Sequence, residues 1–267
     1  MAPSKPKTLG TPAASGQNGR AWFDDDGFWQ DYAPILFGQE RWAEAPAVVD
    51  SVLTLAGTAE GASVLDVCCG PGRHAIAFAS RAHPVVGIDI TVSYIEAARE
   101  TARSMGLSAE FIHADARTWS RPGAFGLAVN LFTSFGYFDT KAEDEAMLAR
   151  IRDNLAPGGS LVIELVGKEL AVRDFIQGER FERDGRLIMT EFQVIGPWES
   201  LRNRWIIVDG DRRIDRFWVQ RLYSATELRD SLLRSGFGSV SLYGSYEGAA
   251  YDHNAKRLIA VARAPQA

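Results

Sequence analysis

The sequence predicts an α/β fold built around a mostly parallel sheet. Short apolar segments alternate with stretches of helical periodicity between residues 46 and 165, and a two-glycine turn follows the first of these segments. Three such segments also end in an aspartate. Strands that alternate with helices form parallel sheets with right-handed crossovers, and ligands bind beyond the carboxyl ends of the strands. We therefore expect the functional site at that edge of the sheet.

Hydrophobic periodicity places the expected elements in chain order. Apolar runs predict strands at 64–67, 85–89, 111–115, 129–138 and 160–165. Spacing of three and four residues predicts helices at 46–55, 74–81, 92–105, 143–155 and 225–235. Two further strands are expected near the end of the chain, at 240–243 and 257–261.

The segment before the helix at 225–235 is far longer than an ordinary α/β connection. It contains alternating stretches at 186–194, 201–208 and 214–223, separated by Gly-Pro and Asp-Gly-Asp turns. We expect a small antiparallel sheet here, with 168–222 forming a lid over an acceptor pocket. Its aromatic side chains would suit a dimer interface as well.

The two-glycine turn at Gly70 and Gly72 is the most informative motif. A backbone without Cβ atoms can approach a nucleoside closely, and the first helical turn offers unpaired N–H groups. The pattern also fits the dinucleotide signature G-x-G-x-x-G/A, in which the helix N-terminus holds a pyrophosphate. Asp66 favours another ligand, because its carboxylate would repel a pyrophosphate and attract the ammonium and sulfonium groups of S-adenosylmethionine.

Two further aspartates follow the next two strands. Asp89 lies 17 positions after Gly72 (89 − 72), where a carboxylate can accept both ribose hydroxyls. Asp115 is placed to accept from an adenine amino group. A helix cap or a turn is the commoner role of a single aspartate after a strand. Three of them in register with a glycine turn favour a cofactor site.

These residues make the chain similar to the class I S-adenosylmethionine-dependent methyltransferases. The first motif of that family is an acid, three residues and Gly-x-Gly, as at Asp66, Gly70 and Gly72. Acids after the second and third strands match as well. The resemblance covers 61–166 well and extends loosely to the C-terminus, and the region 129–138 looks like that of small-molecule methyltransferases, including amino-sugar N-methyltransferases.

The resemblance implies a Rossmann-like fold whose last strand is antiparallel, with S-adenosyl-L-methionine as the cofactor. The cofactor-binding residues that it implies are Asp66, Cys68, Gly70, Gly72, Asp89, Ile90, Asp115, Ala116, Asn130 and Arg41. Of these, Arg41 would hold the methionine carboxylate, as a basic residue does in relatives of this pattern. The pair Cys68-Cys69 departs from the family, which usually has small residues there, and could narrow the space beneath the methionine group.

Composition limits the class of protein. With 267 residues, 46% of them hydrophobic, the chain can bury a large core without disulfides. Residues 21–267 are expected to form a single domain with its lid, and 1–20 a disordered tail. A net charge of −5, with 29 basic and 34 acidic residues and no Lys/Arg run, disfavours nucleic acid substrates. Two adjacent cysteines and no long apolar run indicate a cytoplasmic protein without zinc, disulfides or a membrane span.

Two segments far apart in the sequence are expected at the mouth of the site. The aromatic segment 22–32 could fold over a bound cofactor, although an aromatic helix face that fills the core explains it equally well. The connection between the last two strands should turn at the same edge. The pocket candidates are Tyr32, Tyr137, Tyr246, Tyr251 and His253.

The function that this resemblance implies is methyl transfer to a small-molecule acceptor, at nitrogen or oxygen, with carbon as a further option. A neutral amine needs no strong base, whereas a hydroxyl or carbon acceptor usually needs a base or a metal. No residue is assigned a catalytic role, since His113 fits a core position better than a base, and no cluster has metal-ligand spacing. An NAD-dependent oxidoreductase and a non-catalytic S-adenosylmethionine-binding sensor or partner subunit are the alternatives.

Overall fold

The computed structural model describes residues 21–266, so the tail expected at 1–20 lies outside the described residues. A seven-stranded sheet forms the centre, with the strand order β10-β11-β5-β4-β1-β2-β3. Its strands are β1 (Val64–Val67), β2 (Val85–Asp89), β3 (Ala109–His113), β4 (Phe125–Asn130), β5 (Leu155–Leu165), β10 (Ser239–Tyr243) and β11 (Leu258–Arg263). Strands β1 to β5 pair in parallel, and β11 runs antiparallel between β5 and β10. The predicted mostly parallel sheet is confirmed.

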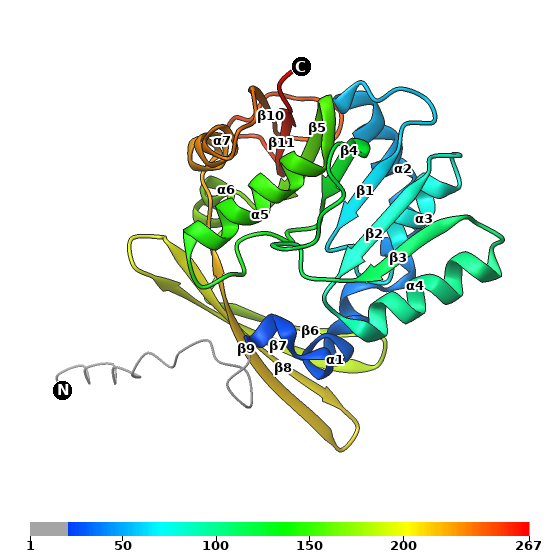
Figure 1. Ribbon diagram of the computed structural model, residues 1–267. Helices are drawn as coiled ribbons and strands as arrows, with labels where there is room; N and C mark the ends of the chain where they lie inside the picture. Colours follow the sequence, from blue (N-terminus) through cyan, green and yellow to red (C-terminus); the bar gives the residue numbers. More distant parts are fainter. Residues whose placement is uncertain (1–20, 267) are drawn as a thin grey trace.

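Helices cover both faces of this sheet (Figure 1). On one face lie α2 (Gln39–Ala56), α3 (Arg73–Ala79) and α4 (Val92–Ser104), and on the other lie α5 (Lys141–Asn154) and α7 (Ala225–Arg234). Alternate residues of each buried strand point to opposite faces, so Val64 packs with α2 and α3 while Leu65 packs with α5. Two apolar layers therefore fix the strands, and with them the edge at which β1 and β2 end.

A second sheet of four antiparallel strands lies at one end of the molecule (Figure 1). It consists of β6 (Gly178–Arg183), β7 (Arg186–Ile195), β8 (Ser200–Asp209) and β9 (Arg212–Arg221), and it follows the short helix α6 (Lys168–Arg173). One of its faces packs against the turn η2 (Trp22–Asp24) and helix α1 (Asp26–Leu36). The small sheet expected from the sequence is thus present, with β6 as an additional edge strand.

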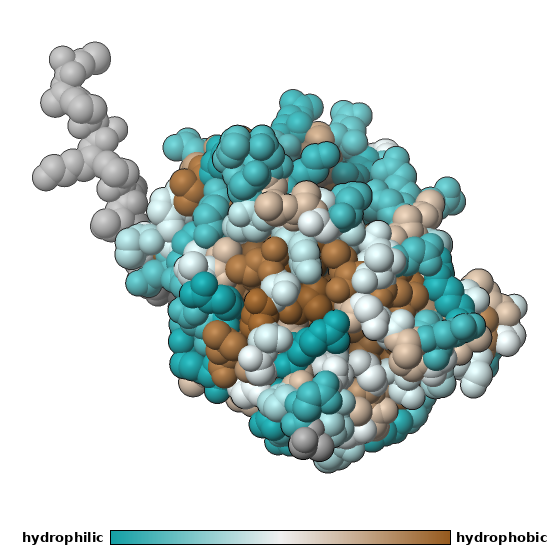
Figure 2. All heavy atoms as spheres, turned by 90° about the horizontal axis from the view of Figure 1, so that it is seen from above, coloured by the Kyte–Doolittle hydropathy of each residue, from teal (hydrophilic) through white to brown (hydrophobic). Residues whose placement is uncertain are grey.

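The view from above Figure 1 shows the end of the molecule opposite the small sheet (Figure 2). Hydrophobic side chains gather near the centre of that face, and hydrophilic ones surround them. In residues 21–266, no helix combines the length and the apolar composition that crossing a bilayer requires.

Several expected boundaries were wrong, among them the start of the fifth strand, which lies at Leu155 and not at 160. The fourth strand ends at Asn130 and does not reach 138, because Phe132 and Thr133 both adopt left-handed backbone angles, with φ of +61° and +59°. The third strand ends at His113, two residues before its aspartate. Helix α2 begins at Gln39 and contains Pro46, which sequence analysis placed at the first helical position.

Candidate active site

The connection between β1 and α3 turns sharply at the carboxyl edge of the large sheet. Gly70 and Gly72 adopt φ values of +56° and +86°, which suit glycine, and Cys68 reaches +59° without being one. A Cβ on Gly72 would lie 2.9 Å from Cβ of Ala98 and 3.0 Å from the ring of Phe111. The second glycine therefore lets α4 and β3 pack against the start of α3.

A cavity with about 740 Å³ of empty space, including its mouth, opens beside this turn. Its lining combines aromatic and apolar side chains with the two carboxylates Asp89 and Asp115, which is typical of a site for a small molecule or cofactor. Seven of the residues expected at the site line it: Cys68, Gly70, Asp89, Ile90, Asp115, Ala116 and Tyr137. The structure thus brings together residues from the ends of β1, β2 and β3 and from the segment after β4.

Asp89 ends β2, and its carboxylate faces this cavity. One oxygen accepts the backbone N–H of Gly70 at 2.8 Å, and the other accepts that of Thr91 at 2.9 Å. Burial raises the pKa of this carboxyl, and the two backbone hydrogen bonds oppose that rise. Each oxygen retains a lone pair, so the pair can accept two adjacent hydroxyls of a ligand.

Asp115 is held by a cation that sequence analysis did not assign to it. Arg117 approaches it with its Nε and Nη2 atoms, the latter at 2.7 Å, and also reaches Glu143 at 2.8 Å. These contacts hold the pKa of Asp115 below its usual value against the opposing effect of burial. The guanidinium of Arg117 also lies 4.5 Å from the ring centre of Phe138, on the cavity wall. Asp115 therefore remains an anionic acceptor at the rim.

Asp66, Gly72 and Asn130 are buried and do not line the cavity. Burial raises the pKa of Asp66 to about 7, and one of its oxygens has no hydrogen-bond partner among the described residues. Asn130 donates to the carbonyl oxygens of Val67 at 3.0 Å and Ser134 at 3.3 Å. In this arrangement Asn130 ties the ends of two strands together.

Arg41 lies outside the cavity, in an ion pair with Glu44 at 3.0 Å. Its guanidinium and that of Arg73 flank the ring of Phe132, at 5.0 Å and 4.2 Å from the ring centre. Arg73 is 4% exposed and donates to the carbonyl oxygen of Arg41. The expected role of Arg41 as a carboxylate holder stays a prediction.

The aromatic segment near the N-terminus divides into two parts. Phe23 and Trp29 line the cavity, whereas Tyr32 is 1% exposed and packs against Phe28 of the same helix and Trp205 and Trp218 of the small sheet. The hydroxyl of Tyr32 has no hydrogen-bond partner among the described residues, and burial raises its pKa far above the usual value. Phe23 and Trp29 therefore lie at the site, as the first interpretation of this segment expects, whereas Tyr32 fills the core, as the second expects.

The C-terminal pocket candidates lie away from this cavity. Tyr246 lines a smaller one with Arg73, His74 and Glu164. The hydroxyl of Tyr251 donates to Glu169 at 3.0 Å, and His253 is exposed. Within residues 21–266, His, Cys, Asp and Glu side chains form no group of three that could hold a metal ion.

Several residues that line the cavity were missed by sequence analysis. They are Phe37, Thr91, Tyr94, Ser134, Phe135 and Gly136, among others. Thr91 directly follows the expected Ile90, and Gly136 is a glycine, which in the structure adopts a φ of +87° in a turn. Both positions therefore carried a local signal in the sequence. Phe37 and Tyr94 lie near helix ends with no local sign of their destination, since tertiary packing alone brings them together, with ring centres 5.2 Å apart.

Comparison with known proteins shows which proteins this chain is similar to. Residues 64–159 match the methyltransferase domain family. The chain superposes on the crystal structure of an S-adenosylmethionine-dependent methyltransferase from Clostridium acetobutylicum ATCC 824 with a TM-score of 0.73, covering 90% of this chain and 98% of that one. Sequence identity to that structure is 14%, so the likeness concerns the fold. Residues 64–159 are therefore similar to a methyltransferase domain, and the chain as a whole shares the fold of an S-adenosylmethionine-dependent methyltransferase.

Two relatives from Streptomyces are similar in sequence. The chain is 29% identical over 152 residues to dTDP-3-amino-3,4,6-trideoxy-alpha-D-glucopyranose N,N-dimethyltransferase of Streptomyces venezuelae. It is 30% identical over 105 residues to dTDP-3-amino-3,6-dideoxy-alpha-D-glucopyranose N,N-dimethyltransferase of Streptomyces fradiae. The matches cover 57% and 39% of this chain, and 62% and 40% of the relatives. The chain thus spans less than two thirds of the length of either relative. Nothing in these comparisons supports an NAD-dependent oxidoreductase.

Proposed function

We propose that this protein transfers a methyl group from S-adenosylmethionine to an amine nitrogen of a small molecule, in the manner of an amino-sugar N-methyltransferase. The observation that carries the proposal is the cavity in which Asp89, held by two backbone amides, faces the space beside the glycine turn. The names of the two Streptomyces relatives support an amino sugar as the acceptor.

The residues present fit this cofactor. Asp89 would accept the two ribose hydroxyls, and Asp115 at the rim would accept the adenine amino group. Ile90 and Ala116 would contact the adenine ring, which suits an aromatic-lined cavity. A Cβ on Gly70 would lie 3.1 Å from the ring of Phe37, so glycine keeps that part of the cradle open. Asp66 would attract the ammonium group from beneath the turn.

A sulfonium cofactor supplies an activated methyl group, so the protein has to orient the acceptor and exclude water. An amine acceptor needs no strong base. Tyr137 lines the cavity, and burial raises its pKa above the usual value, so its neutral hydroxyl can donate to or accept from an acceptor group. The small sheet and the aromatic residues of η2 and α1 would cover the acceptor as a lid.

The proposal includes the setting of the enzyme. We expect residues 21–267 to act as one domain with 168–222 as its lid, in the cytoplasm, on a small-molecule substrate and without nucleic acid. The net charge of −5 supports the last point. A homodimer formed through the small sheet is part of the proposal, since its outer face carries Phe217, which is 37% exposed.

Parallel thermal melts with S-adenosylhomocysteine and NAD test the cofactor. A ligand at 100 times its Kd stabilises the folded state by about 2.7 kcal/mol. We expect a rise in Tm with S-adenosylhomocysteine and none with NAD, and the reverse result would refute the proposal. Incubation with S-adenosylmethionine and dTDP-amino sugars then separates an enzyme from a sensor, because a sensor releases no S-adenosylhomocysteine with any acceptor.

A further inference from the structure

One wall of the cavity is an irregular segment of five residues. Ser134, Phe135, Gly136, Tyr137 and Phe138 all line the cavity and follow β4 without forming a helix or strand. A segment of this kind has no ladder of its own hydrogen bonds to hold it. Its shape therefore depends on the residues that bind its backbone.

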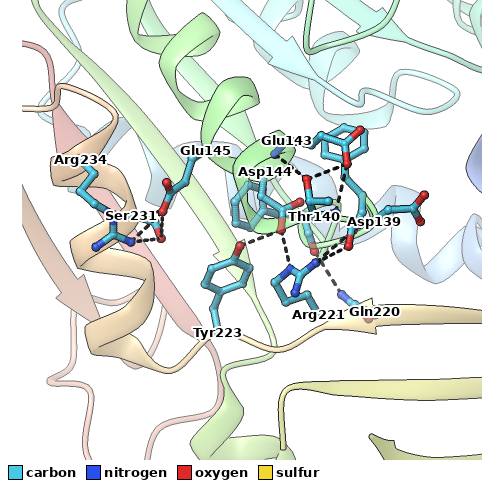
Figure 3. Close-up of polar contacts among 12 residues, drawn as sticks. Asp139, Thr140, Glu143, Asp144, Glu145, Gln220, Arg221, Tyr223, Ser231 and Arg234 are labelled. Atoms are coloured by element: carbon cyan, nitrogen blue, oxygen red, sulfur yellow. Dashed lines mark hydrogen bonds and ion pairs between the residues drawn. The ribbon is translucent and has the colours of Figure 1, made fainter. Parts of the chain in front are cut away.

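The end of β9 binds four carbonyl oxygens of this region. The backbone N–H of Arg221 donates to Gly136 at 2.7 Å, and its Nη2 atom donates to Asp139 at 2.9 Å and to Phe138 at 3.4 Å. The side-chain amide of Gln220 donates to Phe135 at 3.4 Å. Figure 3 shows these side chains reaching from the end of the small sheet toward the start of α5.

Gly136 allows this close approach. Its φ of +87° suits glycine, and a Cβ there would lie 2.6 Å from the carbonyl oxygen of Arg221. Any other residue would force the two backbones apart. The wall of the cavity and the end of the small sheet are therefore in direct backbone contact.

Asp144 of α5 anchors the arginine. It is fully buried, and one of its oxygens accepts Nε of Arg221 at 3.0 Å and the hydroxyl of Tyr223 at 2.7 Å (Figure 3). The ring of Tyr223 also packs on Phe135, with ring centres 5.1 Å apart. A buried carboxylate that lacks its cation is costly, so Asp144 holds the guanidinium in place. The Nη2 group of Arg221 then points to the carbonyls of Phe138 and Asp139.

We propose that Arg221 is a positioning residue, which sets the cavity wall at 134–138 and makes ligand binding at the active site depend on the small sheet. Arg221 does not itself line the cavity, and its guanidinium acts through the backbone that carries Tyr137 and Phe138. The inference rests on the proposed function only for the identity of the ligand.

The test compares Arg221→Gln with Arg204→Gln in the full chain. Arg204 pairs with Asp215 at 2.7 Å on the same sheet, and its partners all lie on that sheet. Calorimetry with S-adenosylhomocysteine should show affinity at least about tenfold weaker for Arg221→Gln and unchanged for Arg204→Gln. Exchange of the backbone amide of residue 221, which donates to Gly136, should accelerate while β1 and β2 keep their protection. Arg221→Lys, which keeps the charge beside Asp144 but not the fork of donors, should give an intermediate affinity.

Two results would overturn the inference. One is an affinity of Arg221→Gln within threefold of the unaltered protein, and the other is faster exchange throughout the large sheet, which would mean general destabilisation. If the unaltered protein does not bind S-adenosylhomocysteine, the proposed function fails. The exchange rate of the backbone amide of residue 221 then decides alone whether Arg221 sets the wall.

Discussion

Among single residues, Asp89 offers the most direct test of the cofactor site. Replacing Asp89 by Asn keeps one acceptor oxygen but removes the charge that would strengthen hydrogen bonds to two hydroxyls. A hydrogen bond to a charged group contributes about 1.5–3 kcal/mol, so S-adenosylhomocysteine should bind roughly 10- to 100-fold more weakly. Calorimetry measures this loss. The exposed turn residue Asp211, changed to Asn, should bind as the unaltered protein does, and equal affinities of both variants would exclude this role of Asp89.

Asp66 should make the stability of the ligand-free protein depend on pH. Its pKa is raised from 3.8 to about 7 by burial, so the folded state holds a proton that the unfolded chain has already lost between these values. The free energy of unfolding should therefore fall as pH rises from about 4 to about 7, by at most roughly 4 kcal/mol. In Asp66→Asn this fall disappears, so the variant should be the more stable protein at pH 8. Urea titrations of both proteins at pH 4 and pH 8 measure their free energies of unfolding. The same pH dependence in the two proteins would contradict the expectation.

The turn that joins β1 to α3 depends on its second glycine. Gly72→Ala combines an unfavourable positive φ with contacts of 2.9 Å to Ala98 and 3.0 Å to Phe111. Gly61→Ala meets the same backbone penalty, with φ of +71°, in open space. We expect a loss of about 1 kcal/mol in the free energy of unfolding for Gly61→Ala and of about 2–4 kcal/mol for Gly72→Ala. Denaturant titration distinguishes them, and equal losses would mean that the close packing carries no cost.

In the whole molecule, one aromatic cluster joins the small sheet to the rest. The ring of Trp218 on β9 lies 5.4 Å from that of Tyr32, 5.6 Å from Phe28 and 6.0 Å from Trp22. Trp218→Ala should lower the free energy of unfolding by about 2–4 kcal/mol, because it leaves a cavity among buried rings. The adjacent Phe217 points to the opposite face and is 37% exposed, so Phe217→Ala should cost less than half as much. Guanidinium titrations test both, and a larger loss for Phe217→Ala would contradict this packing.

The sequence predicted the large sheet because its signals are local. A buried parallel strand is a short apolar run, and a tight turn needs glycine, so β1, β2 and the turn at Gly70 and Gly72 could be placed without knowledge of the fold. Edge strand β6 reads Gly-Glu-Arg-Phe-Glu-Arg, with one apolar side chain, and it carries no such signal. Its strand conformation comes from pairing with β7.

The site was predictable only in part, for the same reason. Asp89 and Asp115 follow strands, and the order of a parallel sheet brings strand ends together, so their places on the cavity could be predicted. The partner of Asp115 could not be predicted, because the side chain of Arg117 has to turn back onto the carboxylate two residues earlier. Tyr32 was expected at the pocket and is buried against the small sheet, since its destination depends on how α1 packs.

The contact between Gly136 and Arg221 also limits how this protein can be recombined with its relatives. A chimera that exchanges only 178–221 would place the relative's residue opposite Asp144, and any residue other than arginine there would leave that carboxylate without its guanidinium. The smallest unit that keeps these contacts is discontinuous, and it comprises the small sheet, the segment 134–139 and Asp144. The small sheet should therefore be exchanged with that of a similar protein as this composite module, rather than as a single stretch of chain.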